Sequence, residues 1–247
     1  MTSSSSFRIA FQPIANLTKD GLRIYGYEAL ARDAHGHVPG ELLKSHGSQV
    51  TYEFDFSCRR QAILDASILG LDTNLSLNFM PGAICDPQYG IDATVQVAID
   101  SSFPLDRLVV EVTEREPVTD YKPIRNCIDR HRQNGVKLAL DDFGTGYNGL
   151  NTLLELSPDI IKVDMKLVQK IETDHARQAL MFAISNGGRR LGMQIVAEGV
   201  ETSEAVEALR SVSITLMQGY LFARPGTGYL PQIPPDVANG PVKVFPA

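Results

Sequence analysis

Cysteine is scarce in this sequence, and its spacing is unusual for a metal or disulfide scaffold. The 247 residues include three cysteines, Cys58, Cys85 and Cys127, an odd count without a Cys-x-x-Cys pair. This pattern predicts neither a disulfide framework nor a zinc site, both of which need paired or closely spaced cysteines. We therefore expect a protein of a reducing compartment.

Long apolar runs are absent as well. No stretch of eighteen apolar residues occurs, so no membrane-spanning segment is predicted. Residues 1–6 lack the basic segment followed by an apolar one that is typical of a secretory signal, and we expect them to be a flexible N-terminus. These features predict a soluble protein located in the cytoplasm.

An excess of positive charge is the third missing feature. The chain has 23 Lys and Arg against 29 Asp and Glu, a formal net charge of -6. Proteins that bind a nucleic-acid duplex usually contact its phosphates through a basic surface, so we expect no nucleic-acid duplex as partner. A ligand that carries phosphate would need cations to offset the acidic side chains.

What the sequence does contain is an alternation of short apolar runs with longer segments of helical periodicity. This pattern is typical of βα units around a parallel sheet, and the length fits one (β/α)8 barrel. We place this α/β domain at residues 7–225, and residues 226–247 form a Pro-rich C-terminal tail on the surface or disordered. The predicted helices are Ser57 to Leu69, Tyr121 to Asn134, Asp174 to Leu191 and Thr202 to Leu209.

Polar side chains follow the apolar runs at the points where the predicted strands end. These residues are Glu28, Asn78, Glu111, Asp141, Asp142, Lys162, Asp164 and Glu198. An isolated acid is more often a solvated surface charge, but the carboxyl ends of parallel barrel strands meet around one face. Their repetition therefore predicts an active site at that face.

Acids in this position would be buried, and unpaired buried charges cost several kcal/mol. A pair of divalent cations would resolve the conflict, with Asp141 and Asp142 supplying a bridge and a second ligand from adjacent positions. Oxygen ligands without His or Cys favour Mg²⁺ or Mn²⁺. Lys162 is either a lysine whose stem covers apolar surface or a group that orients water and neutralises phosphate charge.

A second hypothesis rests on the glycines after this acidic pair. The segment Gly144 to Gly149 reads G-x-G-x-x-G after a predicted strand, and Asp164 lies twenty residues beyond Gly144, as in nicotinamide-dependent oxidoreductases. The two adjacent acids would, however, face a bound pyrophosphate without compensation. Asp-Phe-Gly also occurs in protein kinases, but the glycine-rich loop and strand lysine that should precede it are missing.

Several motifs, taken in order, resemble one family, the EAL domain cyclic di-GMP phosphodiesterases. They are Phe11-Gln12-Pro13-Ile14, Tyr27-Glu28-Ala29-Leu30-Ala31-Arg32, Leu77-Asn78-Phe79, Glu111-Val112-Thr113-Glu114, Asp141-Asp142-Phe143-Gly144-Thr145-Gly146-Tyr147, Ile161-Lys162-Val163-Asp164, Ala197-Glu198-Gly199-Val200-Glu201-Thr202 and Gln218-Gly219-Tyr220. They span nearly the whole chain at family-like spacing. The resemblance implies a modified TIM (β/α)8 barrel in which one strand runs antiparallel, and hydrolysis of cyclic di-GMP to linear pGpG.

The resemblance also implies roles for individual residues. The first of two Mg²⁺ or Mn²⁺ ions would be held by Glu28, Asn78, Glu111 and Asp141, and the second by Asp141, Asp142 and Glu198. Lys162 would position the attacking water, so that the catalytic set is Lys162, Glu28, Asp141 and Asp142. Substrate would be contacted by Gln12 and Arg32 and, near the metals, Asp164, with support from Glu114, Glu201 and Gln218. The family also implies a homodimer.

Members of this family that lost catalysis act as cyclic di-GMP receptors or protein-interaction modules, which is the main alternative here. Such proteins usually lack one or more ligands, whereas every expected ligand is present in this chain. The pair Asn148-Gly149 departs from the small residues that are frequent in the family at that point. It touches the loop that would complete the second metal site, so it bears on metal affinity or dimer formation rather than on the fold.

Overall fold

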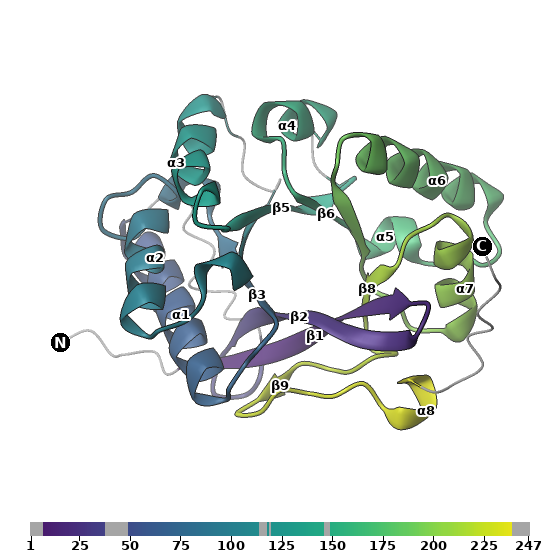
Figure 1. The fold of residues 1–247 in the computed structure, drawn as a ribbon, viewed down its shortest axis with the longest axis horizontal. Helices are drawn as coiled ribbons and strands as arrows, with labels where there is room; N and C mark the ends of the chain where they lie inside the picture. The colour runs from purple at the N-terminus through teal and green to yellow at the C-terminus, as the bar shows by residue number, and fades with distance from the viewer. Residues whose placement is uncertain (1–6, 38–48, 114–117, 119, 146–148, 239–247) are drawn as a thin grey trace.

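Eight strands close into a barrel, and a ninth lies outside it (Figure 1). The computed structural model describes residues 7–37, 49–113, 118, 120–145 and 149–238. Strand β1 (Arg8–Thr18) runs antiparallel to both of its barrel neighbours, β2 (Gly21–Arg32) and β8 (Leu216–Gln218). The remaining barrel pairs are parallel. The predicted modified barrel with one antiparallel strand is confirmed.

Helices cover the outside of the barrel, as expected for βα units. The other strands are β3 (Asn74–Phe79), β4 (Leu108–Thr113), β5 (Lys137–Phe143), β6 (Ile160–Val163), β7 (Gln194–Ala197) and β9 (Gly226–Thr227). The helices are α1 (Gln49–Ile68), α2 (Ile91–Asp100), α3 (Lys122–Arg132), α4 (Gly149–Leu156), α5 (Met165–Val168), α6 (His175–Arg190), α7 (Ser203–Ser211) and α8 (Pro235–Ala238), with short 3₁₀ turns η1 (Pro81–Ala83) and η2 (Leu105–Arg107).

Local capping explains where two of the four predicted helices begin. The Asp174 side chain accepts hydrogen bonds from the backbone N–H groups of Ala176 and Arg177 at the start of α6. Thr202 caps α7 in the same way, through the N–H of Ala205. Each cap satisfies a backbone donor that has no partner within the helix. These two helices therefore begin where the sequence predicts.

The barrel interior has an apolar layer directly beneath the predicted site. Ile14, Val109, Ala139, Ile160, Val196 and Leu216 form this buried cluster. Because side chains alternate across a strand, a residue two positions further along points to the same side. Glu111 therefore points to the same side of its strand as Val109, and Lys162 to the same side as Ile160. The apolar cluster fills the barrel interior, and the polar side chains lie next to it at the carboxyl ends of the strands.

The segment after residue 225 is in contact with the barrel over the part that the structure describes. Strand β9 pairs with β1 at Phe11 and Gly226. The Tyr27 hydroxyl donates to the carbonyl oxygen of Pro231 at 3.0 Å, and Val237 of α8 packs against the core. Residues 1–6 and 239–247, which the sequence analysis treats as terminal segments, lie outside the described residues.

The prediction of no disulfide framework is wrong in one respect. Cys85 and Cys127 form a disulfide with a Cα to Cα distance of 6.0 Å, and Cys58 is free. The two cysteines are 42 positions apart in the sequence, and they meet because the segment after β3 lies against α3 of the following βα unit. Cysteine spacing alone contains no information about that tertiary contact.

Candidate metal centre

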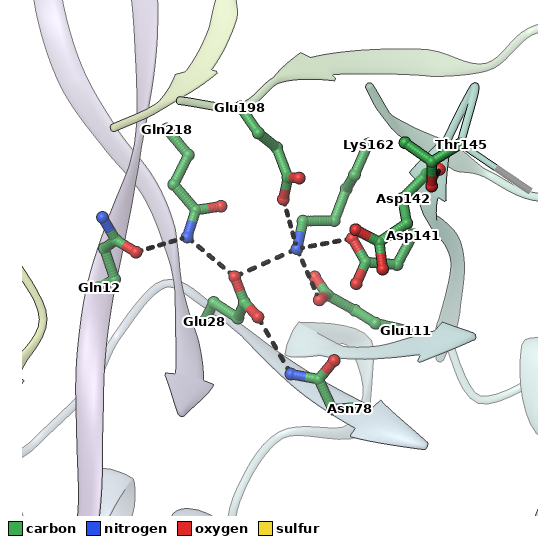
Figure 2. A network of polar contacts seen from close by, with 10 residues as sticks. All are labelled: Gln12, Glu28, Asn78, Glu111, Asp141, Asp142, Thr145, Lys162, Glu198 and Gln218. Atoms are coloured by element: carbon green, nitrogen blue, oxygen red, sulfur yellow. Dashed lines mark hydrogen bonds and ion pairs between the residues drawn. The ribbon is translucent and has the colours of Figure 1, made fainter. Parts of the chain in front are cut away.

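The centre of the site is the Lys162 ammonium group, which four carboxylates surround (Figure 2). Its Nζ atom lies 3.1 Å from Glu28 Oε2, 2.8 Å from Glu111 Oε2, 3.2 Å from Asp141 Oδ1 and 2.9 Å from Glu198 Oε1. The four acids come from β2, β4, β5 and the residue after β7. The barrel thus brings together, at the carboxyl ends of its strands, acids that are far apart in the sequence.

Amide side chains hold Glu28 in place. Asn78 Nδ2 donates to Glu28 Oε1 at 3.0 Å, and Gln218 Nε2 donates to Glu28 Oε2 at 2.8 Å. Gln218 Nε2 also lies 3.2 Å from Gln12 Oε1, and Gln12 Nε2 donates to the carbonyl of Ala223 at 3.2 Å. These contacts orient the Gln218 amide so that its NH₂ group faces Glu28 and Gln12.

One lysine does not balance four acids, of which Glu28 and Glu111 are buried and Asp141 and Glu198 are partly buried. Burial raises the pKa of Glu111 well above its usual range and raises the pKa of Asp141, against the lowering effect of Lys162. Burial also opposes ionisation of Glu28, but Lys162 and the hydrogen bonds from Asn78 and Gln218 leave its pKa below the ordinary value. The acids in turn raise the pKa of Lys162 well above its usual range, although burial lowers it. Additional positive charge at this site would therefore stabilise the ionised carboxylates.

The oxygen atoms of this cluster fit divalent cations. The Oε1 atom of Glu111 is buried without a hydrogen-bond partner, which is costly for a carboxylate. Asp141, Asp142 and Glu198 each offer a ligand atom within 4.8 Å of the others. An all-oxygen donor set suits hard cations such as Mg²⁺, Mn²⁺ or Ca²⁺. The cluster is therefore a candidate divalent-metal site.

Asp142 reaches this group through an irregular backbone. In a regular strand, adjacent side chains point to opposite faces, which would separate Asp141 from Asp142. Asp142 has a φ of 56°, and the register of β5 with β6 shifts between Leu140 and Phe143. A non-glycine residue in this conformation costs on the order of 1–2 kcal/mol. The strain places two adjacent carboxylates beside the same cluster.

Thr145 closes the turn that follows this irregularity. Its hydroxyl donates to the carbonyl of Asp142 at 3.0 Å, and its backbone N–H donates to the same oxygen at 3.2 Å. Gly144 between them has a φ of 99°, which glycine adopts freely. Gly144, the first glycine of the segment that suggested a nucleotide-binding loop, therefore shapes the turn beside Asp142. Thr145 belongs to the predicted motif, but nothing in the sequence indicates this role for its hydroxyl.

Some predicted site residues lie outside the Lys162 cluster. Asp164 Oδ1 accepts from the backbone N–H of Lys166 at 2.8 Å and caps α5. Arg32 donates to the carbonyl of Ala31 at 2.8 Å, and Glu201 is exposed at the start of the segment leading to α7. Glu114 lies outside the described residues. Their roles in substrate binding or support stay predictions.

Without metal, the protein should lose stability as the pH rises through a window set by Glu198. Burial raises the pKa of this carboxyl from 4.5 to about 8, against the lowering effect of Lys162. Between these values the folded protein keeps a proton that the unfolded chain releases, so the free energy of unfolding falls as the pH rises. Urea unfolding in EDTA across this window should show the decline, and Glu198→Gln should make it shallower, with the rest due to the raised pKa values of Glu111 and Asp141. An unchanged slope in that variant would contradict the assignment.

Comparison with known proteins adds a family to this geometry. The family model described as EAL domain matches residues 1–225. Among curated proteins of Escherichia coli strain K12, the oxygen sensor protein DosP is 35% identical over 241 residues, which are 90% of this chain and 29% of DosP. The probable cyclic di-GMP phosphodiesterase PdeG is 34% identical over 88% of this chain and 44% of its own length. The chain spans less than half of either relative.

Solved structures show the same fold. A standalone versatile EAL protein from Vibrio cholerae O395, in its c-di-GMP bound form, has a TM-score of 0.87 and 37% identity, and the match covers 96% of this chain and 99% of that one. BlrP1 from Klebsiella pneumoniae, in a manganese and cy-diGMP complex, has a TM-score of 0.83 and 34% identity over 94% of this chain and 59% of BlrP1.

Proposed function

Because this chain belongs to the EAL domain family, we propose that it hydrolyses one phosphodiester bond of cyclic di-GMP and releases linear pGpG. The observation that carries the proposal is the group of four carboxylates around Lys162, with Asp142 placed beside them by a strained backbone. The relatives named for cyclic di-GMP, and the neighbours solved with it, supply the substrate class.

Two divalent cations, Mg²⁺ or Mn²⁺, belong to this proposal. The residues that would hold them are Glu28, Asn78, Glu111 and Asp141 for one ion, and Asp141, Asp142 and Glu198 for the other. When bound, such ions make water a stronger nucleophile and stabilise negative charge on the phosphoryl oxygens. The unpartnered Oε1 atom of Glu111 supports this assignment.

Three side chains of this protein would position the water and the substrate. The Lys162 ammonium stays charged among the acids, so it can hold a water or a phosphate oxygen by charge-assisted hydrogen bonds. Arg32 offers a planar guanidinium suited to phosphate, and Gln12 is held by Gln218 and Ala223. In the hydrolysis, the water oxygen becomes bonded to phosphorus, and the bond from phosphorus to one ribose oxygen breaks with transfer of a proton to that oxygen.

The direct test is incubation of the purified protein with cyclic di-GMP, with Mg²⁺, with Mn²⁺ and with EDTA, followed by chromatography of the nucleotides. We expect pGpG in the metal-containing samples and none with EDTA, because the ions supply the charge that the lysine does not. Binding measured in parallel separates the alternatives. Binding without product in every metal would identify a receptor, and metal-independent binding of a nicotinamide nucleotide instead would favour the oxidoreductase hypothesis.

Two predictions about the surroundings of the enzyme accompany this proposal, a homodimer and a location in the cytoplasm. Leu150 and Leu154, one turn apart on α4, are 73% and 66% exposed and follow the loop after Asp142, which supports pairing through this face. Sedimentation at increasing protein concentration tests the pairing.

None of the helices in the described ranges is long and apolar enough to cross a membrane.

A further inference from the structure

A second buried cation, Arg59, lies next to the backbone of Asn78 and outside the Lys162 cluster. Arg59, in the middle of α1, has a side chain that is 2% exposed and forms an ion pair with Asp55, one helical turn earlier. A buried guanidinium costs free energy unless its donors are satisfied. The Arg59 donors are satisfied by acceptors on α1, at the end of β3 and at the start of α2.

The contacts of Arg59 converge on the strand that carries Asn78. Its Nη1 atom donates to the backbone carbonyl of Asn78 at 3.4 Å, and its Nε atom donates to Thr94 Oγ1 of α2 at 3.1 Å. Its Nη2 atom donates to the carbonyl of Tyr89, just before α2. One planar side chain therefore connects α1, the end of β3 and the start of α2.

The residues on either side of the Asn78 carbonyl are held by the same pair. The Arg59 guanidinium carbon lies 3.8 Å from the centre of the Phe79 ring, a cation–π distance. Asp55 Oδ2 accepts from the backbone N–H of Met80 at 3.4 Å. Arg59 and Asp55 thus contact three consecutive residues of the chain, residues 78–80.

This segment needs external support because its strand pairing is one-sided. Pairing of β3 with β2 ends at Leu77, opposite Ala29, while pairing with β4 continues through Asn78 and Phe79. The side chain of Asn78 nevertheless has to point at Glu28 Oε1, 3.0 Å away. The Arg59 and Asp55 pair supplies contacts on the outer side of the strand end while the amide faces the barrel interior.

We propose that Arg59, with Asp55, is a positioning residue that fixes Asn78 for the divalent cation held by Glu28, Asn78, Glu111 and Asp141. The inference rests on the proposed function for the identity of that ligand set. Groups that orient metal ligands from behind commonly affect metal affinity about 10- to 100-fold. Arg59 would thus influence the metal centre without contacting metal or substrate. A lysine could keep the charge but not the forked contacts to Asn78 and Tyr89.

The test is a titration of the full chain with Mn²⁺ by calorimetry, without substrate. Arg59→Lys should weaken the affinity for Mn²⁺ about 10-fold or more. Ile63→Val, a core change one turn further along α1 (Ile63 is 0% exposed), is the matched control: it should lower stability to urea and leave Mn²⁺ affinity unchanged. Arg59→Lys with reduced stability but wild-type Mn²⁺ affinity would overturn the proposal and leave Arg59 a purely structural role.

A double-mutant cycle shows whether the effect passes through Asn78. If it does, Arg59→Lys combined with Asn78→Ala should bind Mn²⁺ about as weakly as Asn78→Ala alone, whereas additive losses would overturn the proposal. Should Arg59→Lys not fold, Thr94→Val removes one hydrogen bond of Arg59, together with the one from Thr94 to the Gly90 carbonyl, at nearly constant volume. It should still weaken Mn²⁺ binding about threefold, a small part of the usual range, and unchanged binding overturns the proposal. Because no substrate is used, a failure of cyclic di-GMP hydrolysis leaves this test intact.

Discussion

Replacing Glu28 by alanine is expected to lower the rate of cyclic di-GMP hydrolysis by about 1,000-fold or more, with the barrel still folded. Glu28 contacts Lys162, Asn78 and Gln218, so its removal takes away a proposed metal ligand and the acceptor that orients two amides. Metal ions contribute several kcal/mol to stabilisation of transition-state charge, and each 1.36 kcal/mol is a factor of ten in rate.

The measurement is turnover at saturating Mn²⁺, with circular dichroism and urea unfolding to establish the folded state. Glu172→Ala, which removes an exposed acid near α5, is the matched control and should keep wild-type turnover. Glu28→Gln preserves the volume and part of the hydrogen bonding but cannot supply the charge, so it should resemble Glu28→Ala. Near-normal turnover in both Glu28 variants would show that the metal assignment is wrong.

The position of the site could be predicted from the sequence because it depends on two simple periodicities. In a barrel of parallel strands, the carboxyl ends of all strands lie at the same face, so an acid that follows an apolar run lies at that face. The alternation of side chains then sets which residue points inward, as for Glu111 two positions after Val109. The antiparallel course of β1 came from resemblance to a family, since a hairpin and a parallel pair share the same apolar alternation.

Other features depend on tertiary contacts that no local pattern contains. The disulfide between Cys85 and Cys127 forms across two βα units. Two adjacent acids in a strand would ordinarily face opposite ways, and only the positive φ of Asp142 brings it beside Asp141. Arg59 reads in the sequence as one charge of a surface helix, and its burial appears only when α1, α2 and β3 are packed together.

Lys162 gives the second large effect, and it concerns stability as well as rate. Without metal, replacing Lys162 by methionine should lower the free energy of unfolding by about 3–5 kcal/mol, the usual range when one partner of a buried charge pair is removed. The four carboxylates around Nζ would lose the cation that they share. Some of them would take up protons instead, so the loss should be larger near pH 8 than near pH 5.5.

Added Mn²⁺ should restore much of that stability, because the metal supplies the charge that the lysine supplied. Turnover should nevertheless remain low, since the metal replaces the charge of Lys162 but not the hydrogen bonds to water or phosphate that we propose for it. Urea unfolding with EDTA and with Mn²⁺ measures both effects, and Lys166→Met, an exposed lysine of α5, is the matched control. If Lys162→Met unfolded like wild type in EDTA, the acids would have to be neutral without the lysine, and its role as their counter-ion would be lost.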